Sequence, residues 1–295
     1  MGLRIWGLLW CLAWACHGSA QAAQPDRLAA SAAVVETLQR SGARIDTPRA
    51  VVYFEGGLVS AADQAAWADR ISEGIGHIEK LLTASFGDTK LEYYVSSRVT
   101  ETSYSIRAYN APPRTFLASD RVLRGAAPYL HEAVHHLVFR LAVGGGDGQL
   151  HFWAFEGFPS YVEDAVVARF GGVAGRVFVA GGNETVDDEA RAALGTAGGR
   201  RVLEFIGRVG LPSGMEDRQN VAKPFYVLAQ SLTKHLIETV GLDAFVRSLL
   251  PHMLNAPAFE REVQRLAGKS LDRLAAEWRE KIERPAASKP SARGE

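Results

Sequence analysis

Cysteine is almost absent from this chain. Two cysteines occur among 295 residues, and both lie in an apolar run near the amino terminus. The run follows Arg4, is too short to span a bilayer and leads into small residues, which is the pattern of a secretory signal peptide over residues 1–22. No cysteine remains once this signal is cleaved. Disulfides and thiolate metal ligands are therefore excluded from the mature protein.

An excess of charge and further long apolar runs are also missing. Lys+Arg and Asp+Glu each number 33, so the formal net charge is +0. Without basic clusters, nucleic acid is not expected as a partner. No later segment is apolar over the length of a bilayer, so we expect no membrane span after signal cleavage. An exported chain without disulfides indicates a periplasmic or secreted protein, and a monomer is favoured.

The most informative motif is H-E-x-x-H at residues 131–135. Positions four apart share one face of an α-helix, so His131 and His135 can reach a single ion. Glu132 is adjacent and can accept a proton from water at that ion. This is the kernel of a zinc hydrolase, and the alternative is an amphipathic helix with two surface histidines.

The sequence around the motif favours a buried helix over residues 128–142. Pro128 suits a helix start, and Gly144 to Gly146 would end the helix. A buried pair of imidazoles needs a partner such as a metal more than a surface pair does. The apolar residues that indicate burial are Leu130, Ala133, Val134, Leu137, Val138 and Leu141.

A catalytic zinc site needs a third protein ligand. The metzincin class is excluded because Val138 and Leu141 stand where it has glycine and histidine. Further on, Trp153-Ala-Phe-Glu156-Gly-Phe-Pro-Ser-Tyr161 is similar to the second zinc motif of the gluzincins of the aminopeptidase N type, W-x-x-E-G-F-A-x-Y. The matching positions are Trp153, Glu156, Gly157, Phe158 and Tyr161.

This resemblance implies a gluzincin zinc metallopeptidase with one zinc ion per chain, held by His131, His135 and Glu156. It covers residues 125 to 170 and extends less closely to 240. Twenty residues separate His135 from Glu156, two more than is usual in the family, and the glycine-rich run at 144–148 can absorb them. The family fold is α+β, a small twisted sheet followed by a mainly helical half, as in thermolysin-like catalytic domains.

Other polar residues near the motifs have weaker claims. His136 points about 100° away from His135 around the helix and is expected to be packed or surface-exposed. His151 could replace Glu156 as a ligand, but it precedes the second helix, which we expect to begin near Glu156. Glu163 returns to the face of Glu156 and is either an acceptor for a ligand imidazole or a solvated glutamate. Asp164 is expected to be a surface charge.

The length left after signal cleavage allows one large domain or two small ones. The resemblance implies one gluzincin-like domain over residues 26–283, with a mixed part at 26–120 and a helical part at 121–283. Residues 284–295 are expected to form a disordered tail. Helices are expected at 26–41, 60–83 and 223–241, and strands at 50–54, 91–95, 102–107 and 114–118. By resemblance, an edge strand binds an extended substrate, and residues 102–107 or 114–118 are the candidates.

The expected mechanism follows from these residues. Zinc would activate a water molecule. Glu132 would accept a proton from that water and pass it to the leaving amine. By resemblance, Tyr226 near the start of a later helix stabilises the oxyanion, with His235 as a weaker alternative.

Three classes of function remain open. The favoured one is a zinc peptidase that acts on peptides or proteins. It is expected to be endo-acting because the family's G-x-M-E-N motif, whose acidic residue recognises a free amino terminus, is missing around residues 107–114, although Glu101 could take that role. The alternatives are a zinc hydrolase of a non-peptide substrate and a catalytically inactive gluzincin-like binding protein.

Overall fold

The computed structural model describes most of the chain between Gln24 and Arg284. The described ranges are 24–99, 104–106, 113–143, 150–171, 182–211, 214–215 and 217–284. The expected signal peptide, nearly all of the expected tail, the glycine run at 144–148 and Glu101 lie outside them. Within the described ranges, no helix combines the length and the apolar character needed to cross a membrane.

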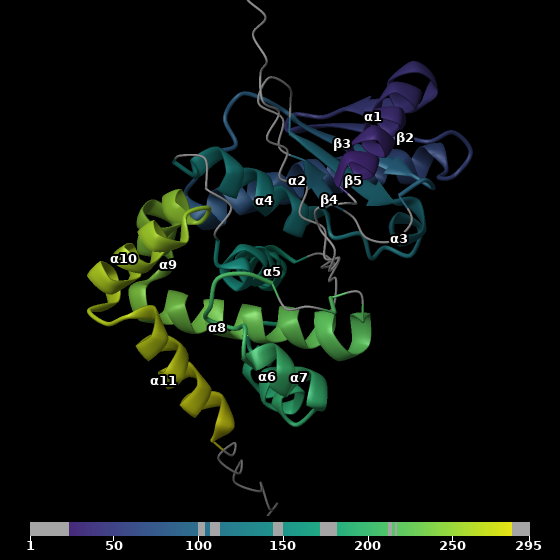
Figure 1. The fold of residues 1–295 in the computed structure, drawn as a ribbon. Helices are drawn as coiled ribbons and strands as arrows, with labels where there is room; N and C mark the ends of the chain where they lie inside the picture. The colour runs from purple at the N-terminus through teal and green to yellow at the C-terminus, as the bar shows by residue number, and fades with distance from the viewer. Residues whose placement is uncertain are drawn as a thin grey trace, which may run out of the picture. The chain divides into compact units, whose positions relative to one another are not determined.

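The chain divides into two compact units, residues 1–140 with 172–177 and residues 141–171 with 178–295. The first contains a five-stranded sheet and the second is helical in its described part, so the expected α+β class is confirmed (Figure 1). Each unit is described separately below.

The sheet of the first unit has the strand order β1-β2-β3-β5-β4. Strands β2, β3 and β5 pair in parallel, whereas β1 and β4 pair antiparallel at the two edges. Every residue of β2 is buried, as expected for a central strand covered on both faces. The strands are β1 (Ala43–Asp46), β2 (Ala50–Phe54), β3 (Leu91–Ser96), β4 (Tyr104–Ile106) and β5 (Arg114–Ala118).

A row of stacked aromatic rings crosses one face of this sheet. The ring centroids of Tyr53 and Tyr94 are 4.9 Å apart, those of Tyr94 and Phe116 5.4 Å, and those of Phe116 and Tyr104 5.0 Å. Helix α1 (Gln24–Ser41) packs on this face, and its Ser31 Oγ lies 2.9 Å from the Tyr104 hydroxyl (Figure 1). The row and this contact hold β4, which has only three residues, in register with β5.

Three further helices belong to the first unit, and the longest of them begins at a capped residue. The Ser60 side chain accepts a hydrogen bond from the Asp63 amide, which fixes the start of that helix. The three helices are α2 (Ala61–Leu82), α3 (Ser119–Leu123) and α4 (Tyr129–Leu141).

The second unit is built around the packing of α5 (Phe152–Phe170) on α8 (Lys223–Val240). Gly157 is the point of closest approach, since a Cβ there would lie 2.4 Å from both Ala229 O and Thr233 Oγ1. The remaining helical elements are α6 (Val186–Leu194), α7 (Ala197–Leu203), η1 (Arg218–Ala222), α9 (Leu242–Ala244), η2 (Phe245–Leu249), η3 (Leu250–His252), α10 (Ala256–Ala267) and α11 (Leu271–Glu283).

A partly buried polar cluster ties α6, α8 and α11 together. Asp187 accepts hydrogen bonds from Ser231 Oγ at 2.7 Å and from Lys234 Nζ at 2.7 Å, and Lys281 Nζ lies 3.1 Å away. The Ser231 hydroxyl in turn accepts a hydrogen bond from Trp278 Nε1 at 2.8 Å. Burial alone would raise the pKa of the Asp187 carboxyl, but the hydrogen bonds from Lys234, Ser231 and Lys281 outweigh it and lower the pKa below its ordinary value.

The predicted elements agree closely with the structure, with two differences in the sheet. The predicted helices at 26–41, 60–83 and 223–241 and the strands at 50–54, 91–95 and 114–118 are confirmed. Strand β1 was not predicted, because its residues are mostly exposed and do not form an apolar run. The prediction that residues 114–118 could form the edge was wrong for that strand, because β5 is paired on both sides, whereas β4 lies at the edge.

We predict that Asp187→Asn lowers the free energy of unfolding at pH 7 by about 1–3 kcal/mol, because it removes a charged acceptor from a partly buried cation cluster. The folded pKa of Asp187 lies below the ordinary 3.8, so its stabilisation is complete above that pH and is lost as the pH falls through the folded pKa. Urea unfolding at pH 7 and at pH 3 measures the effect. The control is Asp188→Asn, whose side chain is 70% exposed and which we expect to change stability by less than about 0.5 kcal/mol. Equal losses for both variants would contradict the prediction.

Candidate metal centre

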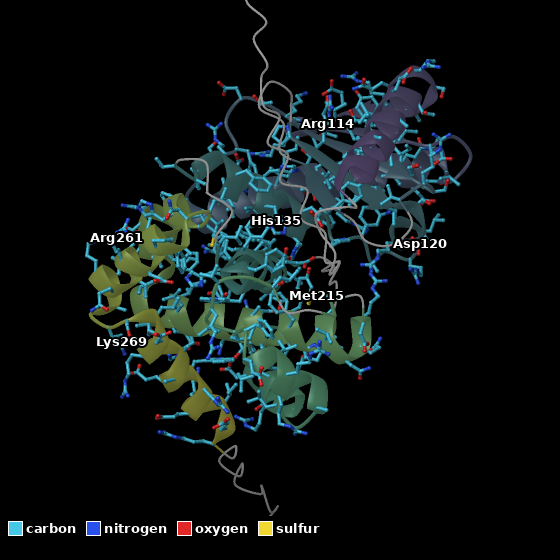
Figure 2. All side chains as sticks on the ribbon, in the orientation of Figure 1. Arg114, Asp120, His135, Met215, Arg261 and Lys269 are labelled. Carbon is cyan, nitrogen blue, oxygen red and sulfur yellow. The ribbon has the colours of Figure 1, made fainter. Side chains whose placement is uncertain are left out.

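Helix α4 carries the two histidines of the H-E-x-x-H motif on one buried face. His131 and His135 are 2% and 6% exposed, so the alternative of two surface histidines is wrong. Their Nε2 atoms lie 3.1 Å apart, and the ring centroids are 4.8 Å apart (His135 is marked in Figure 2). Two buried imidazoles that turn the same ring atom toward one point form the first half of a ligand set.

The predicted third ligand, Glu156, is a buried residue of α5 in the second unit. The helix begins at Phe152 rather than near Glu156, so the carboxylate belongs to the second turn. The neighbouring Gly157 allows α5 to approach α8 closely, which explains a glycine directly after the glutamate.

Among the described residues, His131, His135 and Glu156 form a group of metal-ligand type. One ligand atom from each lies within 4.8 Å of the other two, and all three residues are buried. Two imidazole nitrogens and one carboxylate are the donor set of a hydrolytic zinc site with an open fourth position. Tetrahedral zinc with Zn–N bonds of about 2.0 Å places two nitrogen ligands about 3.3 Å apart, close to the observed separation of the two Nε2 atoms. The residues therefore fit a zinc ion.

The competing histidines are engaged elsewhere. His136 Nε2 lies 2.9 Å from Thr115 Oγ1, and burial lowers the pKa of His136 to about 3, with a smaller contribution from His135. His136 is therefore a neutral packed histidine, which is one of the two possibilities predicted from the sequence. His151 Nε2 lies 2.9 Å from Glu260 Oε1.

The two acidic residues after Glu156 are both buried. Glu163 is 3% exposed, which removes the alternative of a solvated glutamate. Asp164 is 4% exposed and accepts a hydrogen bond from Gln230 Nε2, so the prediction of a surface charge was wrong. The reason is that α5 is buried on nearly every side, so an amphipathic pattern could not locate its solvent face.

Tyr226 lies in the first turn of α8 and is 4% exposed. Its ring packs edge-on against Phe225, with centroids 5.8 Å apart. Its role as an oxyanion donor stays a prediction. His235 is further along the same helix, and burial lowers its pKa, with Lys281 contributing in the same direction.

One partner of Glu132 was not predicted from the sequence. Ser105 on β4 donates a hydrogen bond from its Oγ to Glu132 Oε2 at 2.7 Å, and the same atom lies 3.2 Å from the Glu132 carbonyl oxygen. Strand alternation offered a signal, because an apolar Tyr104 on one face places Ser105 on the other. The face that meets α4 could not be known without the sheet.

No protein-family model matches the chain, and no curated protein matches it. A solved structure titled as native leukotriene A4 hydrolase from Saccharomyces cerevisiae is similar in fold, with a TM-score of 0.48 and 16% sequence identity. The match covers 83% of this chain, which spans 39% of that protein.

We predict that the purified protein binds one zinc ion and that His131→Ala and Glu156→Ala each abolish stoichiometric binding, because each removes one of three ligands. Metal analysis after dialysis measures the zinc content, and the rise in unfolding midpoint on adding zinc gives an independent readout. His77→Ala, in α2 and outside the cluster, is the control and should keep one zinc. Full zinc content in either ligand variant would show that the ligand set is wrong.

Proposed function

We propose that this protein is a zinc-dependent hydrolase that cleaves peptide bonds. The observation that carries the proposal is the buried group of His131, His135 and Glu156 with Glu132 next to the first histidine. A structural zinc site is usually closed by four protein ligands, whereas three ligands leave a position for chemistry. A glutamate adjacent to the ligands, rather than a fourth ligand, suits a hydrolytic site.

A zinc ion held by these three residues would supply Lewis-acid polarisation of a carbonyl and a lowered pKa of water. The chain supplies the proton transfer. Glu132 accepts a proton from the attacking water, and the protonated carboxyl then delivers that proton to the leaving nitrogen as the bond to carbon breaks. The hydrogen bond from Ser105 is to one carboxylate oxygen, Oε2, and we assign the proton exchange to the other.

Stabilisation of the developing oxyanion is assigned to Tyr226. A hydrogen bond from a phenol to the oxyanion becomes stronger as negative charge develops, and this accelerates the reaction. Support comes from its buried place in the first turn of α8, the helix that packs on α5 and thus belongs to the same unit as Glu156. His235 is the weaker alternative.

A peptide is the substrate class that β4 favours. This strand lies at the edge of the described sheet, next to β5, and its central residue contacts Glu132. A peptide that pairs with an edge strand gains main-chain hydrogen bonds irrespective of its side chains. We further propose that the protein is exported, on its amino-terminal pattern, and that it cleaves within chains, because the G-x-M-E-N motif is missing.

We predict that Glu132→Gln keeps one zinc per chain and lowers turnover at least ~100-fold, because an amide cannot accept the proton. Cleavage of a mixed peptide library, with products identified by mass spectrometry, gives the rate. The control is Glu36→Gln, an exposed glutamate on α1, which should match wild type. Wild-type turnover in the Glu132 variant would exclude the general-base role, and cleavage of esters but not peptides would favour the non-peptide alternative.

We predict that a peptide with an acetylated amino terminus is cleaved as fast as the same peptide with a free amino terminus. The reason is that the sequence lacks the G-x-M-E-N motif, whose acidic residue would pair with a terminal ammonium group. Matched fluorescent peptides and product sequencing measure the preference. A strong preference for the free peptide, with release of single amino-terminal residues, would identify an aminopeptidase instead.

A further inference from the structure

We propose that Ser105 is a positioning residue for the general base, and that it acts as the last member of a chain of hydrogen-bond donors running from His136 through Thr115 to the Glu132 carboxylate. The proposal rests on the proposed function, in which Glu132 transfers the proton. Its geometry lies entirely within the first unit, on α4, β4 and β5.

The sheet register brings these side chains together. Ser105 pairs with Thr115 across β4 and β5, and Tyr93 pairs with Thr115 across β3 and β5. Side chains alternate along a strand, so the stacked ring of Tyr104 on the α1 face places Ser105 on the opposite face. That opposite face meets α4, as the hydrogen bond from the Tyr93 hydroxyl to the Tyr129 carbonyl shows.

The hydrogen bond from Ser105 to Glu132 sets the direction of the other two. An ionised Glu132 carboxylate can only accept, so the Ser105 proton is donated to Glu132 Oε2 at 2.7 Å. The Thr115 hydroxyl, 3.2 Å from Ser105 Oγ, must then donate to Ser105. Thr115 Oγ1 is left to accept from His136 Nε2 at 2.9 Å, which requires the neutral His136 to carry its proton on Nε2.

Three donors in series, of which only Ser105 contacts the carboxylate, strengthen the last hydrogen bond. Each hydrogen bond polarises the next, so the final donor to Glu132 is stronger than an isolated serine hydroxyl. The serine has one proton, and the shorter distance to Oε2, 2.7 Å against 3.2 Å to the Glu132 carbonyl oxygen, assigns that proton to the carboxylate. A general base loses rate when it is misplaced by about 1 Å, so a fixed carboxylate favours turnover rather than substrate affinity.

The chain also connects the base to the strand that we propose to bind substrate. Ser105 is the middle residue of β4, which has three residues and is held by the aromatic row on its other face. Any shift of β4 along β5 therefore moves the donor to Glu132. Correct seating of a substrate on β4 and correct placement of the base thus depend on the same residue.

The test is a set of Ser105 variants measured with full zinc loading. We expect Ser105→Ala to lower kcat about 10–100-fold, the effect of one hydrogen bond to a charged group, with KM within about threefold of wild type. Ser105→Thr keeps the hydroxyl and should restore kcat to within about threefold. In a Glu132→Gln background, Ser105→Ala should cause little further loss, because the serine acts through the glutamate. Ser97→Ala removes another serine to glutamate hydrogen bond, the one to Glu55, and should leave kcat unchanged.

A second readout needs no activity. In the zinc-free protein, Ser105→Ala should lower the unfolding midpoint by a few degrees, and by much less in a Glu132→Ala background. An inactive wild-type protein would contradict the proposed function. The dependence of the Ser105→Ala midpoint shift on Glu132 would still test the hydrogen bond between the two residues. The inference would be overturned by an unchanged kcat in Ser105→Ala, or by an unchanged unfolding midpoint in that variant. It would also be overturned if Ser105→Ala lowered kcat by the same factor in the wild-type and Glu132→Gln backgrounds.

Discussion

The site depends on one physical constraint, the burial of two imidazoles four residues apart on a single helix. His131 and His135 lose their hydration in α4 and turn their Nε2 atoms to within 3.1 Å of each other. Buried polar nitrogens at that separation are stabilised when they share a cation, and a buried carboxylate such as Glu156 balances the charge. Glu132 is placed at the site by the same helix, since it is the next residue after His131.

The sheet contributes the environment of the base. The aromatic row on one face anchors β4, and strand alternation then directs Ser105 toward Glu132 on the other face. His136 Nε2 lies 2.9 Å from Thr115 Oγ1 and is the first donor of the proposed chain. The short edge strand therefore contributes to the site, because the hydroxyl of its central residue donates a hydrogen bond to Glu132, the proposed general base.

Local sequence predicted the parts of the site that local structure determines. His131 and His135 could be identified because helical spacing brings them to one face, and Glu132 because it is adjacent to His131. Glu156 could be identified because residues 153–161 resemble a known zinc motif, whose glycine the structure explains by the close packing of α5 on α8. Ser105 and Thr115 could not be identified, because their contacts follow from the pairing of β4 with β5 and from the face that α4 covers. Asp164 was misplaced for a related reason, since a helix that is buried on nearly all sides shows no polar face.

The central claim is that His131, His135 and Glu156 hold one catalytic zinc ion, and X-ray absorption spectroscopy of the zinc-loaded protein tests it most directly. The account predicts a first shell of nitrogen and oxygen only, at about 2.0–2.1 Å, with outer-shell scattering from two imidazoles. The Glu156→Ala variant, titrated with zinc, should lose or change this shell while His77→Ala keeps it. A spectrum with no imidazole scattering, or with scattering from three or four imidazoles, would contradict the account.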